Sequence, residues 1–313
     1  MNASTQVTLE CHAGPQTEGG TRPRLSVVVP TRNSEPTLGR CLESIRAQVD
    51  ASGRPFPCEL IVVDNNSSDR TLVIAETHAD IVETWGPERS AQRNRGAARA
   101  NAPYVLFIDS DMVLDPSVCA EVATHLDRGA GAVIVPEESF GVGYFARCRA
   151  LEKKITTGDP RTEAARGFPI QLLRQVGWNE SLTGPEDWEL TERINATGAR
   201  TGRTEAIIHH DEGRLRLRGT FTKKTYYGRG VGKYLAGSAS SASRPSASMA
   251  QRARRLSPLR LLRKPGLLIR RPDLAAGMMT LKVVEAAGIA TGIVAAARAA
   301  RRPGRTAHDG PVR

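Results

Sequence analysis

The chain has 313 residues, of which 40% are hydrophobic and 25% charged. This composition is typical of a soluble globular protein with a full core. Its five cysteines are odd in number and form no C-x-x-C pair, which argues against a disulfide framework or a zinc knuckle and favours a reducing cytoplasm.

The net charge of +11 is unevenly spread along the chain. The segment from Gly213 to Arg313 contains 22 of the 44 basic residues but only 3 of the 33 acidic ones. A basic tail behind a mildly acidic body predicts contact between the tail and a polyanion. Candidate polyanions are membrane lipid head groups, a pyrophosphate-bearing substrate or nucleic acid. Few aromatic residues accompany the arginines beyond Ser240, which argues against nucleic acid because single strands stack on aromatic side chains.

The polar N-terminal residues 1–24 lack the apolar stretch of a secretory signal and predict a disordered leader. Strand and helix patterns alternate after it. The continuous apolar run Leu25–Pro30 predicts a strand buried on both faces of a parallel sheet. A helix over Pro36–Val49 with Ser34 as its cap should follow.

The same alternation continues through the first half of the chain. Expected strands are Glu59–Asp64, Ile81–Glu83, Tyr104–Asp109 and Ala132–Val135, and expected helices begin after a Ser67–Ser68 cap, span Arg89–Asn101, and start with Asp115 as N-cap and Pro116 in the first turn. This order predicts an α/β fold with a Rossmann-like, doubly wound, mostly parallel sheet. Ligands bind such sheets outside the carboxyl ends of the strands, where the polar clusters 30–33, 64–69 and 109–111 should converge.

The second half of the chain is less regular. A helix is expected over Glu186–Thr197 and a short strand over Ile207–His209. A Ser/Ala-rich linker at 237–250 separates the expected domain, 25–236, from a basic helical tail, 251–313.

The tail contains the most apolar stretch of the chain, Leu274–Ala300. Three charged residues interrupt it, so it should fall short of an uncharged membrane-spanning segment. Apolar side chains recur at helical spacing and predict an amphipathic helix lying on another surface, namely Leu274, Met278, Leu281 and Val284.

Two acidic motifs carry the strongest chemical signals. Asp109 and Asp111 are separated by one residue after an apolar strand, so both can address one ligand. Paired carboxylates suit Mn²⁺ or Mg²⁺, and such an ion binds a diphosphate, although a solvated turn would use the same residues.

Glu186 and Asp187 open a helix, where acids are favoured by the helix dipole or can supply a general base. Trp188 beside them could stack on a sugar ring or belong to the core.

Four further groups are weaker candidates. Asp64, at a strand end, can accept hydrogen bonds from a base or ribose. His209 and His210 include a candidate third metal ligand, or are surface residues. The arginine-rich segment Arg89–Gly96 suits a pyrophosphate or forms a solvated helix face. Lys224 and Tyr227 could hold an anionic or lipid pyrophosphate acceptor, or mark the root of the tail.

Taken together and in this order, the blocks resemble the family 2 glycosyltransferases with a GT-A fold. The resemblance covers roughly 25–234 and rests on four blocks, SVVVPTRNSEPTLGRCLESI, ELIVVDNNSSDRT, RNRGAARANAPYVLFIDSDM and GPEDWEL, followed by the histidines at 209 and 210. It implies a metal-dependent, inverting hexosyltransferase that uses a nucleotide diphosphate sugar, with UDP as the family default. The acceptor would be a hydroxyl group, including one on a lipid-linked molecule.

The resemblance also implies roles for individual residues. Asp187 would be the catalytic base, and Asp111 and His210, or its neighbour His209, would meet Mn²⁺ or Mg²⁺. Glu186, Trp188, His209, Lys224 and Tyr227 would be candidates for contact with the acceptor or the diphosphate. The nucleotide sugar would be bound by a larger set, comprising Pro30, Thr31, Asn33, Asp64, Asn94, Arg95 and Asp109.

Two other functions fit parts of the sequence. A sugar-1-phosphate nucleotidyltransferase shares the sheet and the acidic metal ligands, but opens with a glycine-rich loop, whereas no glycine precedes Gly39 in PTRNSEPTLG. A noncatalytic nucleotide-sugar or membrane-binding module would explain the basic tail. We expect a cytoplasmic enzyme whose tail meets the anionic cytoplasmic face of a membrane as a peripheral contact.

Overall fold

A computed structural model describes residues 22–159, 162–236, 252 and 257–300. The predicted linker lies outside these residues, as does most of the predicted leader, so both stay predictions. Among the described residues, seven strands form one sheet in the order β3-β2-β1-β4-β8-β6-β9. Their bounds are β1 Leu25–Thr31, β2 Cys58–Asp64, β3 Ile81–Thr84, β4 Tyr104–Phe107, β6 Ala132–Ile134, β8 Gly167–Pro169 and β9 Thr201–Arg203.

The pairings in this sheet are parallel except those of β8, which runs antiparallel to β4 and β6. The predicted mostly parallel α/β sheet is therefore confirmed. Helices of the first half alternate with the strands as expected, and those of the second half follow residue 140. They are α1 Glu35–Arg46, α2 Thr71–His78, α3 Arg89–Arg99, α4 Val118–Asp127, α5 Tyr144–Thr156, α6 Ile170–Val176 and α7 Glu186–Asn195.

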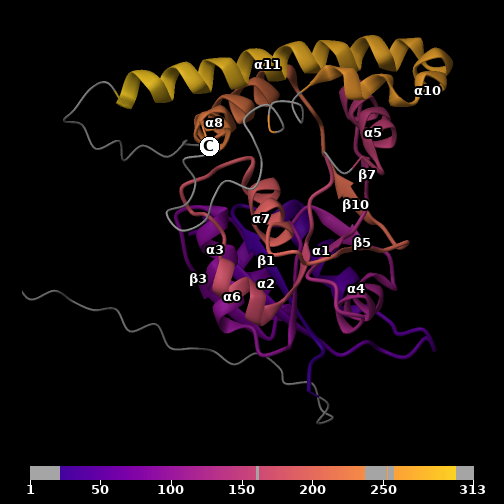
Figure 1. The fold of residues 1–313 in the computed structure, drawn as a ribbon, viewed down its shortest axis with the longest axis vertical. Coiled ribbons are helices and arrows are strands. Elements are labelled where there is room, and N and C mark those ends of the chain that lie inside the picture. Colours follow the sequence, from indigo (N-terminus) through magenta and orange to yellow (C-terminus); the bar gives the residue numbers. More distant parts are fainter. Residues whose placement is uncertain (1–21, 160–161, 237–251, 253–256, 301–313) are drawn as a thin grey trace, which may run out of the picture.

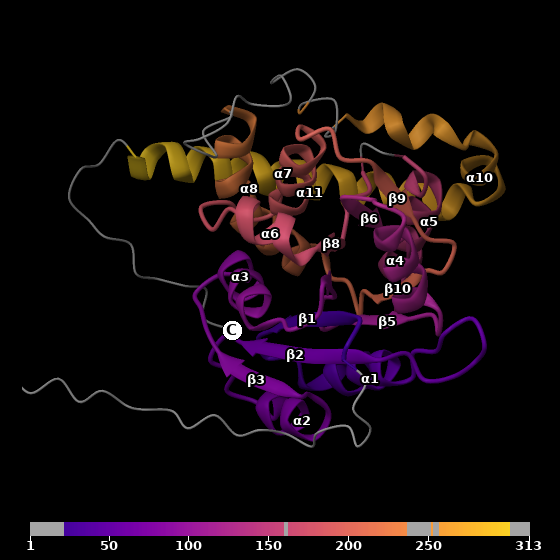
Figure 2. The same cartoon turned by 60° about the horizontal axis from the view of Figure 1, so that its bottom comes forward.

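The central strand β1 explains the continuous apolar run in the sequence. Val27 and Val29 belong to a buried cluster with α1, α2 and α4, whereas Val28 belongs to a second cluster with α3, α6 and α7. Figure 2 shows α2 and α3 on opposite faces of the sheet. Helix α3 lies so close to β1 that a Cβ on Gly96 would come 2.3 Å from Val28 Cγ1.

A second, three-stranded sheet extends the molecule beyond the end of β4. Its order is β5-β10-β7, with β5 Met112–Leu114, β7 Glu137–Phe140 and β10 Ile208–Asp211. His210 pairs with Met112, and the Asp211 amide donates to the Asp111 carbonyl at 2.8 Å. This pairing brings the histidines to the acidic motif, although the two lie far apart in the chain.

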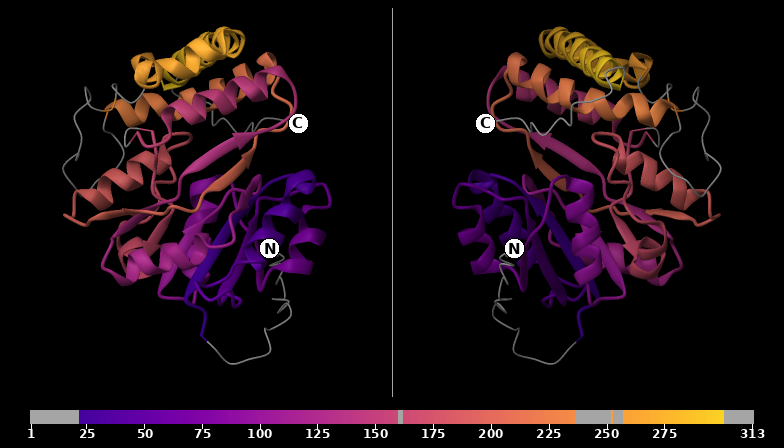
Figure 3. Two further views of the ribbon diagram at one scale, coloured as in Figure 1. Left: turned by 90° about the vertical axis from the view of Figure 1, so that its right-hand side faces the viewer. Right: turned by 90° about the vertical axis from the view of Figure 1, so that its left-hand side faces the viewer.

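The C-terminal helices form an outer layer on the α5 side. They are α8 Leu217–Ala236, the short 3-10 helix η1 Pro258–Arg263, α10 Pro265–Arg270 and α11 Pro272–Ala300. Helix α11 lies across α8 and α5 as the outermost element (Figures 1 and 3). Leu274, Met278 and Leu281 are buried in one cluster with α5 residues, and Val284 is half-buried, so the predicted helical spacing is confirmed.

Several local expectations differ from the structure. By length and composition Pro272–Ala299 is apolar enough to cross a membrane, contrary to the expectation from its charges. Helix α2 has Arg70 as its N-cap instead of the serines, and α4 begins at Val118 with Ser117 as its N-cap instead of Asp115. Ser34 does cap α1, but its side chain makes no capping hydrogen bond. In each case the hydroxyl or carboxylate contacts a distant segment instead, as described below.

Candidate functional site

The three polar clusters predicted to converge do so at the carboxyl ends of β1, β2 and β4. The backbone N–H of Asn33 donates a hydrogen bond to Ser67 Oγ at 2.8 Å, which joins the first two clusters. Ser34 Oγ and Ser110 Oγ lie 2.8 Å apart, which joins the first cluster to the acidic motif. The serines expected to cap helices therefore connect the tips of neighbouring strands.

The tips of β1 and β2 form an internally satisfied cluster. Asp64 is fully buried, and its Oδ1 accepts hydrogen bonds from Thr31 Oγ1 at 2.9 Å and Ser67 Oγ at 2.5 Å. Its Oδ2 accepts the Ser67 amide at 2.8 Å. Asn33 adopts a left-handed backbone conformation, φ 49°, and its Oδ1 accepts the Ser68 amide. Pro30 is buried next to them in β1.

Asn94 and Arg95 make their contacts away from this cluster. Asn94 exchanges hydrogen bonds with the Trp178 backbone and donates to Glu180 Oε1 at 2.7 Å. Arg95 forms an ion pair with Glu83 at the edge strand β3. Their predicted role at the diphosphate stays a prediction without a supporting contact, whereas both have a clear structural use.

The centre of the site is Arg93, which the sequence reasoning included in an arginine-rich segment but did not single out. Its side chain is fully buried, and its guanidinium lies 4.5 Å from the centroid of the Trp178 ring. Nη2 lies 2.8 Å from Asp109 Oδ1, and Nη1 lies 2.8 Å from Asp187 Oδ1. One guanidinium thus joins the acidic motif after β4 to the acid at the start of α7.

The pKa values of the two carboxyl groups bridged by Arg93 are shifted in opposite directions. Burial would raise the pKa of the Asp109 carboxyl, but Arg93 and Arg166 outweigh this effect and hold that pKa well below its usual range. Burial raises the pKa of the Asp187 carboxyl, with Glu186 adding to the rise and Arg93 opposing it. An acid with a raised pKa beside a permanently ionised one is typical of a general base.

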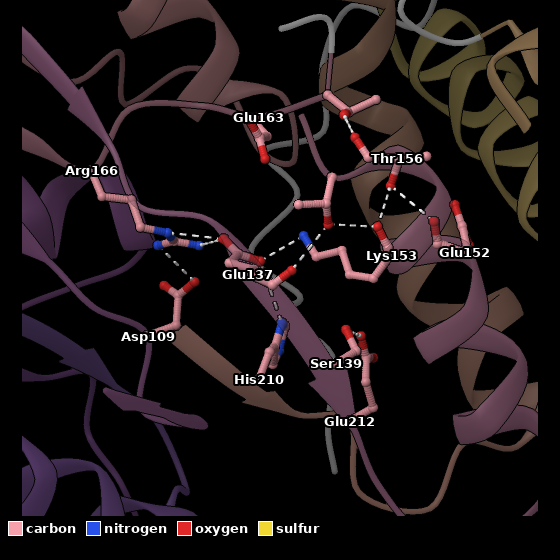
Figure 4. Close-up of polar contacts among 12 residues, drawn as sticks. Asp109, Glu137, Ser139, Glu152, Lys153, Thr156, Glu163, Arg166, His210 and Glu212 are labelled. Carbon is pink, nitrogen blue, oxygen red and sulfur yellow. Dashed lines mark hydrogen bonds and ion pairs between the residues drawn. The ribbon is translucent and has the colours of Figure 1, made fainter. Parts of the chain in front are cut away.

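Figure 4 shows a second, partly buried group next to Asp109, centred on Glu137. Glu137 Oε1 lies 2.6 Å from Arg166 Nη2, and Oε2 lies 2.6 Å from Lys153 Nζ. Arg166 Nη1 reaches Asp109 Oδ2 at 3.5 Å, and His210 Nδ1 lies 3.9 Å from Glu137 Oε2. The chain of charged side chains therefore runs from the end of β4 to β7 and reaches the imidazole of His210 in β10.

The two histidines diverge, because consecutive strand residues face opposite sides of a sheet. His210 Nε2 lies 3.2 Å from Asp111 Oδ2, whereas His209 Nε2 lies 2.9 Å from Asp115 Oδ1. Asp115, expected as a helix cap, therefore contacts β10. Of the two histidines left open by the sequence, His210 is the one beside the acidic motif.

Asp111 and His210 fit a divalent cation in their chemistry. Asp111 Oδ1 is buried and has no hydrogen-bond partner among the described residues, so it has an unused lone pair for a ligand. A hard oxygen with an imidazole suits Mn²⁺. The described residues contain no group of three or more His, Cys, Asp or Glu side chains that could hold a metal ion, so water or a bound diphosphate would supply further ligands.

A cavity of about 820 Å³ opens beside this centre and extends under the C-terminal helices. Lys224, Tyr227 and Trp188 line it, together with His210 and Arg89. Arg89 Nη2 lies 2.5 Å from Glu186 Oε1, and its guanidinium lies 5.7 Å from the Tyr227 ring centroid.

A smaller cavity of about 210 Å³ lies next to the first. Trp188, Glu137 and Lys153 line both cavities, and Asp187 lines the smaller one. The acid at the start of α7 and the predicted acceptor residues thus border adjoining cavities.

The sequence reasoning missed Arg166, Glu137 and Gln92. Gln92 is buried and donates to the carbonyls of Thr31 and Val63, which fixes the ends of β1 and β2. Arg166 precedes a short strand and Glu137 begins another, and neither strand has a clear pattern in the sequence. The glutamates that directly follow the apolar run in VIVPEESF were the available signal for β7.

Comparisons with known proteins agree with this geometry. The family model described as Glycosyl transferase family 2 matches residues 26–169. The chain is 31% identical to the validoxylamine A glucosyltransferase of Streptomyces hygroscopicus over 52% of this chain and 36% of that protein. It is 35% identical to a TPR repeat-containing protein of Synechococcus elongatus over 64% of this chain and 46% of that protein. The chain thus matches less than half the length of these two curated relatives.

Among solved structures, the fold is similar to a mannosyltransferase of Pyrobaculum calidifontis in complex with GDP-Man and Mn²⁺. The TM-score is 0.55 at 20% identity, and the alignment covers 89% of this chain and 88% of that chain. This similarity concerns the fold alone. Residues 26–169 are thus similar to the family 2 glycosyltransferases, and the mostly parallel sheet has the GT-A fold that the sequence predicted.

Proposed function

We propose that the protein is an inverting glycosyltransferase that moves a sugar from a nucleotide diphosphate donor to a hydroxyl acceptor. The observation that carries this proposal is the bridge from Asp109 through Arg93 to Asp187. One end of the bridge is a carboxylate with a raised pKa at a cavity wall. The other end is two residues from Asp111, whose Oδ1 has no hydrogen-bond partner among the described residues. The family supports the reaction class.

The chain's own residues divide the reaction between them. Asp187 would take the proton of the acceptor hydroxyl, whose oxygen then forms a bond to the anomeric carbon as the bond to the diphosphate breaks. Attack opposite the leaving group inverts that carbon. Asp111 and His210 would hold Mn²⁺ or Mg²⁺, which when bound neutralises charge on the departing diphosphate. Arg93 keeps Asp187 in position without touching the substrate.

The donor would lie across the strand tips, with its nucleotide by the cluster of Thr31, Asn33 and Asp64. UDP is the first nucleotide to test because of the family default. GDP is the second, because the Pyrobaculum calidifontis protein binds GDP-Man.

The acceptor would enter the larger cavity, whose lining is rich in basic residues. Arg214, Arg216 and Lys223 line it, and no carboxylate of the described residues forms an ion pair with them. Lys224 and Tyr227 lie farther along α8 in the same lining. Thr220 is 7% exposed, and its hydroxyl has no hydrogen-bond partner within the described chain. These donors fit an acceptor that carries phosphate, such as a lipid pyrophosphate.

Release of nucleoside diphosphate from UDP-, GDP- and dTDP-sugars tests the proposal, with Mn²⁺, Mg²⁺ or EDTA and a membrane extract as acceptor source. We expect one donor to turn over only with metal, and Asp187→Asn to abolish turnover. Asp127→Asn, which changes a surface acid that is 45% exposed, is the matched control and should keep wild-type activity. No turnover of any donor by folded protein would overturn the proposal.

A further inference from the structure

The outermost helix, α11, turns its charged side chains toward the protein and its apolar side chains outward. A surface helix of a soluble protein does the opposite. The two central charged residues of α11, Lys282 and Glu285, face the protein, with side chains 17% and 7% exposed. Glu285 pairs with Arg149 of α5 and lies 3.5 Å from Lys224 of α8, and Lys282 pairs with Glu152. Two of the three charges that interrupt the apolar sequence are therefore neutralised inside.

The outward face of α11 is uncharged over most of its length. Val283 is 67% exposed, Met279 49% and Val294 48%. Exposed residues recur every three or four positions and form one stripe, consisting of Ala276, Met279, Val283, Ala287, Ala290, Val294 and Ala297. A surface helix of a soluble protein turns such a stripe toward the core, so this stripe indicates an apolar environment outside the molecule.

Helix α11 is held flat against the protein and is not free to turn away from it. A Cβ on Gly292 would come 2.1 Å from the Thr225 carbonyl oxygen, and one on Gly288 would come 2.7 Å from the Phe221 carbonyl oxygen. Backbone contact this close, together with the inward ion pairs, fixes α11 on α8. A helix held in this way can lie along a membrane surface more readily than it can cross the membrane.

Basic residues flank the uncharged stripe. Arg263, Lys264 and Arg270 are exposed before it, and Arg298 is exposed at its end. Cations beside an apolar helix face suit a bilayer with anionic lipid head groups. Pairing of two copies of the chain through the stripe would bring these basic ends toward one another, which like-charge repulsion disfavours.

We infer that the outward face of α11 seats the protein on an anionic bilayer, with the helix lying in the plane of the membrane interface. The anionic cytoplasmic leaflet has the required charge. This inference does not depend on the proposed reaction. Because Ala286 and Ile289 of the same helix line the larger cavity, that cavity would open next to the membrane, where a lipid-linked acceptor resides.

Flotation of the full chain with vesicles tests the inference. Wild type should bind vesicles of phosphatidylcholine with phosphatidylglycerol, and bind them less as salt increases. Val283→Glu should lower the partition coefficient at least about tenfold, because one apolar side chain is withdrawn from lipid. Val73→Glu is the matched control: Val73 is 56% exposed on α2, away from α11 (Figure 2), and its substitution should change nothing.

A second measurement separates lipid contact from a folding defect. Val283→Trp should give fluorescence that brominated phospholipid quenches, whereas Val73→Trp should not. The inference would be overturned if the wild-type protein did not bind anionic vesicles. It would also be overturned if Val283→Glu bound them as strongly as wild type. A wild-type dimer that Val283→Glu converts to monomers without any change in vesicle binding would overturn it too, since a second copy would then cover the stripe.

Discussion

The tips of β1 and β2 and the tip of β4 carry similar polar side chains, but they differ in how far those side chains are satisfied. Both oxygens of Asp64 accept hydrogen bonds from Thr31 and Ser67. Beyond β4 and at the start of α7, by contrast, Asp111 Oδ1 and Glu186 Oε2 are buried without a hydrogen-bond partner among the described residues.

Buried polar atoms are nearly always paired, so an unpaired one calls for a water molecule, a ligand or a catalytic role. The satisfied cluster therefore works as a scaffold, and in the proposed function it shapes the nucleotide end of the donor site. In the proposed function, substrate groups complete the contacts of the unsatisfied group near Asp111 and Asp187. Substitutions in the two regions should accordingly affect stability and turnover in different proportions.

The largest effect is expected for Arg93→Met. This change leaves the carboxylates of Asp109 and Asp187 without their shared cation, and loss of one partner of a buried ion pair costs about 3–5 kcal/mol of folding free energy. Chemical denaturation would measure it. Arg95→Met, two positions farther along α3, is the matched control, and an equal loss in both variants would contradict the central place given to Arg93.

Asp187→Asn should reduce kcat by about 10²- to 10⁴-fold, the usual contribution of a general base. Burial raises the pKa of Asp187 in the folded protein, so its ionised form opposes folding, and this cost grows as pH rises through the unfolded-state pKa toward the folded one. The asparagine variant should therefore be at least as stable as wild type at neutral pH. A thermal melt and a turnover assay check both parts, and a loss of stability that accounts for the lost activity would exclude the base.

The same raised pKa predicts how wild-type activity depends on pH. The base must be ionised, so kcat/KM should fall as pH drops through the pKa of Asp187, above the range of an ordinary aspartate of about 3.9. The acid limb should be absent from the residual activity of Asp187→Asn. If the activity of that variant still fell in the same acidic pH range, the titrating group would be one other than Asp187.

Asp64→Ala should have a smaller effect, mainly on stability. It leaves the buried Thr31 hydroxyl and the half-buried Ser67 donors without their acceptor, which costs about 1–3 kcal/mol. The KM for the nucleotide donor should rise while kcat changes little, because the scaffold shapes the binding site. A fall in kcat without a change in KM would place Asp64 in the reaction instead.

The smallest effect is expected for Arg95→Met itself. Arg95 is 37% exposed and paired with Glu83 at the sheet edge, and such pairs contribute about 0–1 kcal/mol. Activity should stay within about threefold of wild type. A large rise in the KM for the nucleotide donor would instead support the contact between Arg95 and the diphosphate that the family resemblance implies.

The parts of the fold that could be predicted from the sequence are those with a strong local pattern. β1 and β2 are buried on both faces and therefore read as continuous apolar runs. β8 has three residues, and β7 alternates partly buried and exposed residues. The sequence of either strand therefore cannot be told apart from that of a loop. The caps were misassigned because Ser67 and Asp115 hydrogen-bond to distant segments, which no local pattern reveals.

The sequence predicted that the acids of the candidate site lie close together, but it did not predict their partners. Asp111, Asp187 and His210 belong to recognisable blocks and do lie in one region of the structure. Arg93 and Arg95 look alike in RSAQRNRG, yet the first is fully buried and the second 37% exposed. The difference arises from the packing of α3 against β1 and Trp178, which depends on residues far apart in sequence.

Calorimetric titration of nucleoside diphosphate, with and without Mn²⁺, tests the division between metal-binding and base residues most directly. The account predicts that Asp187→Asn binds the nucleotide with Mn²⁺ as wild type does, while it loses turnover. Asp111→Asn should lose the enhancement of binding by Mn²⁺. If Asp111→Asn kept that enhancement, or if Asp187→Asn turned over donor at the wild-type rate, the assignment of these two acids would be contradicted.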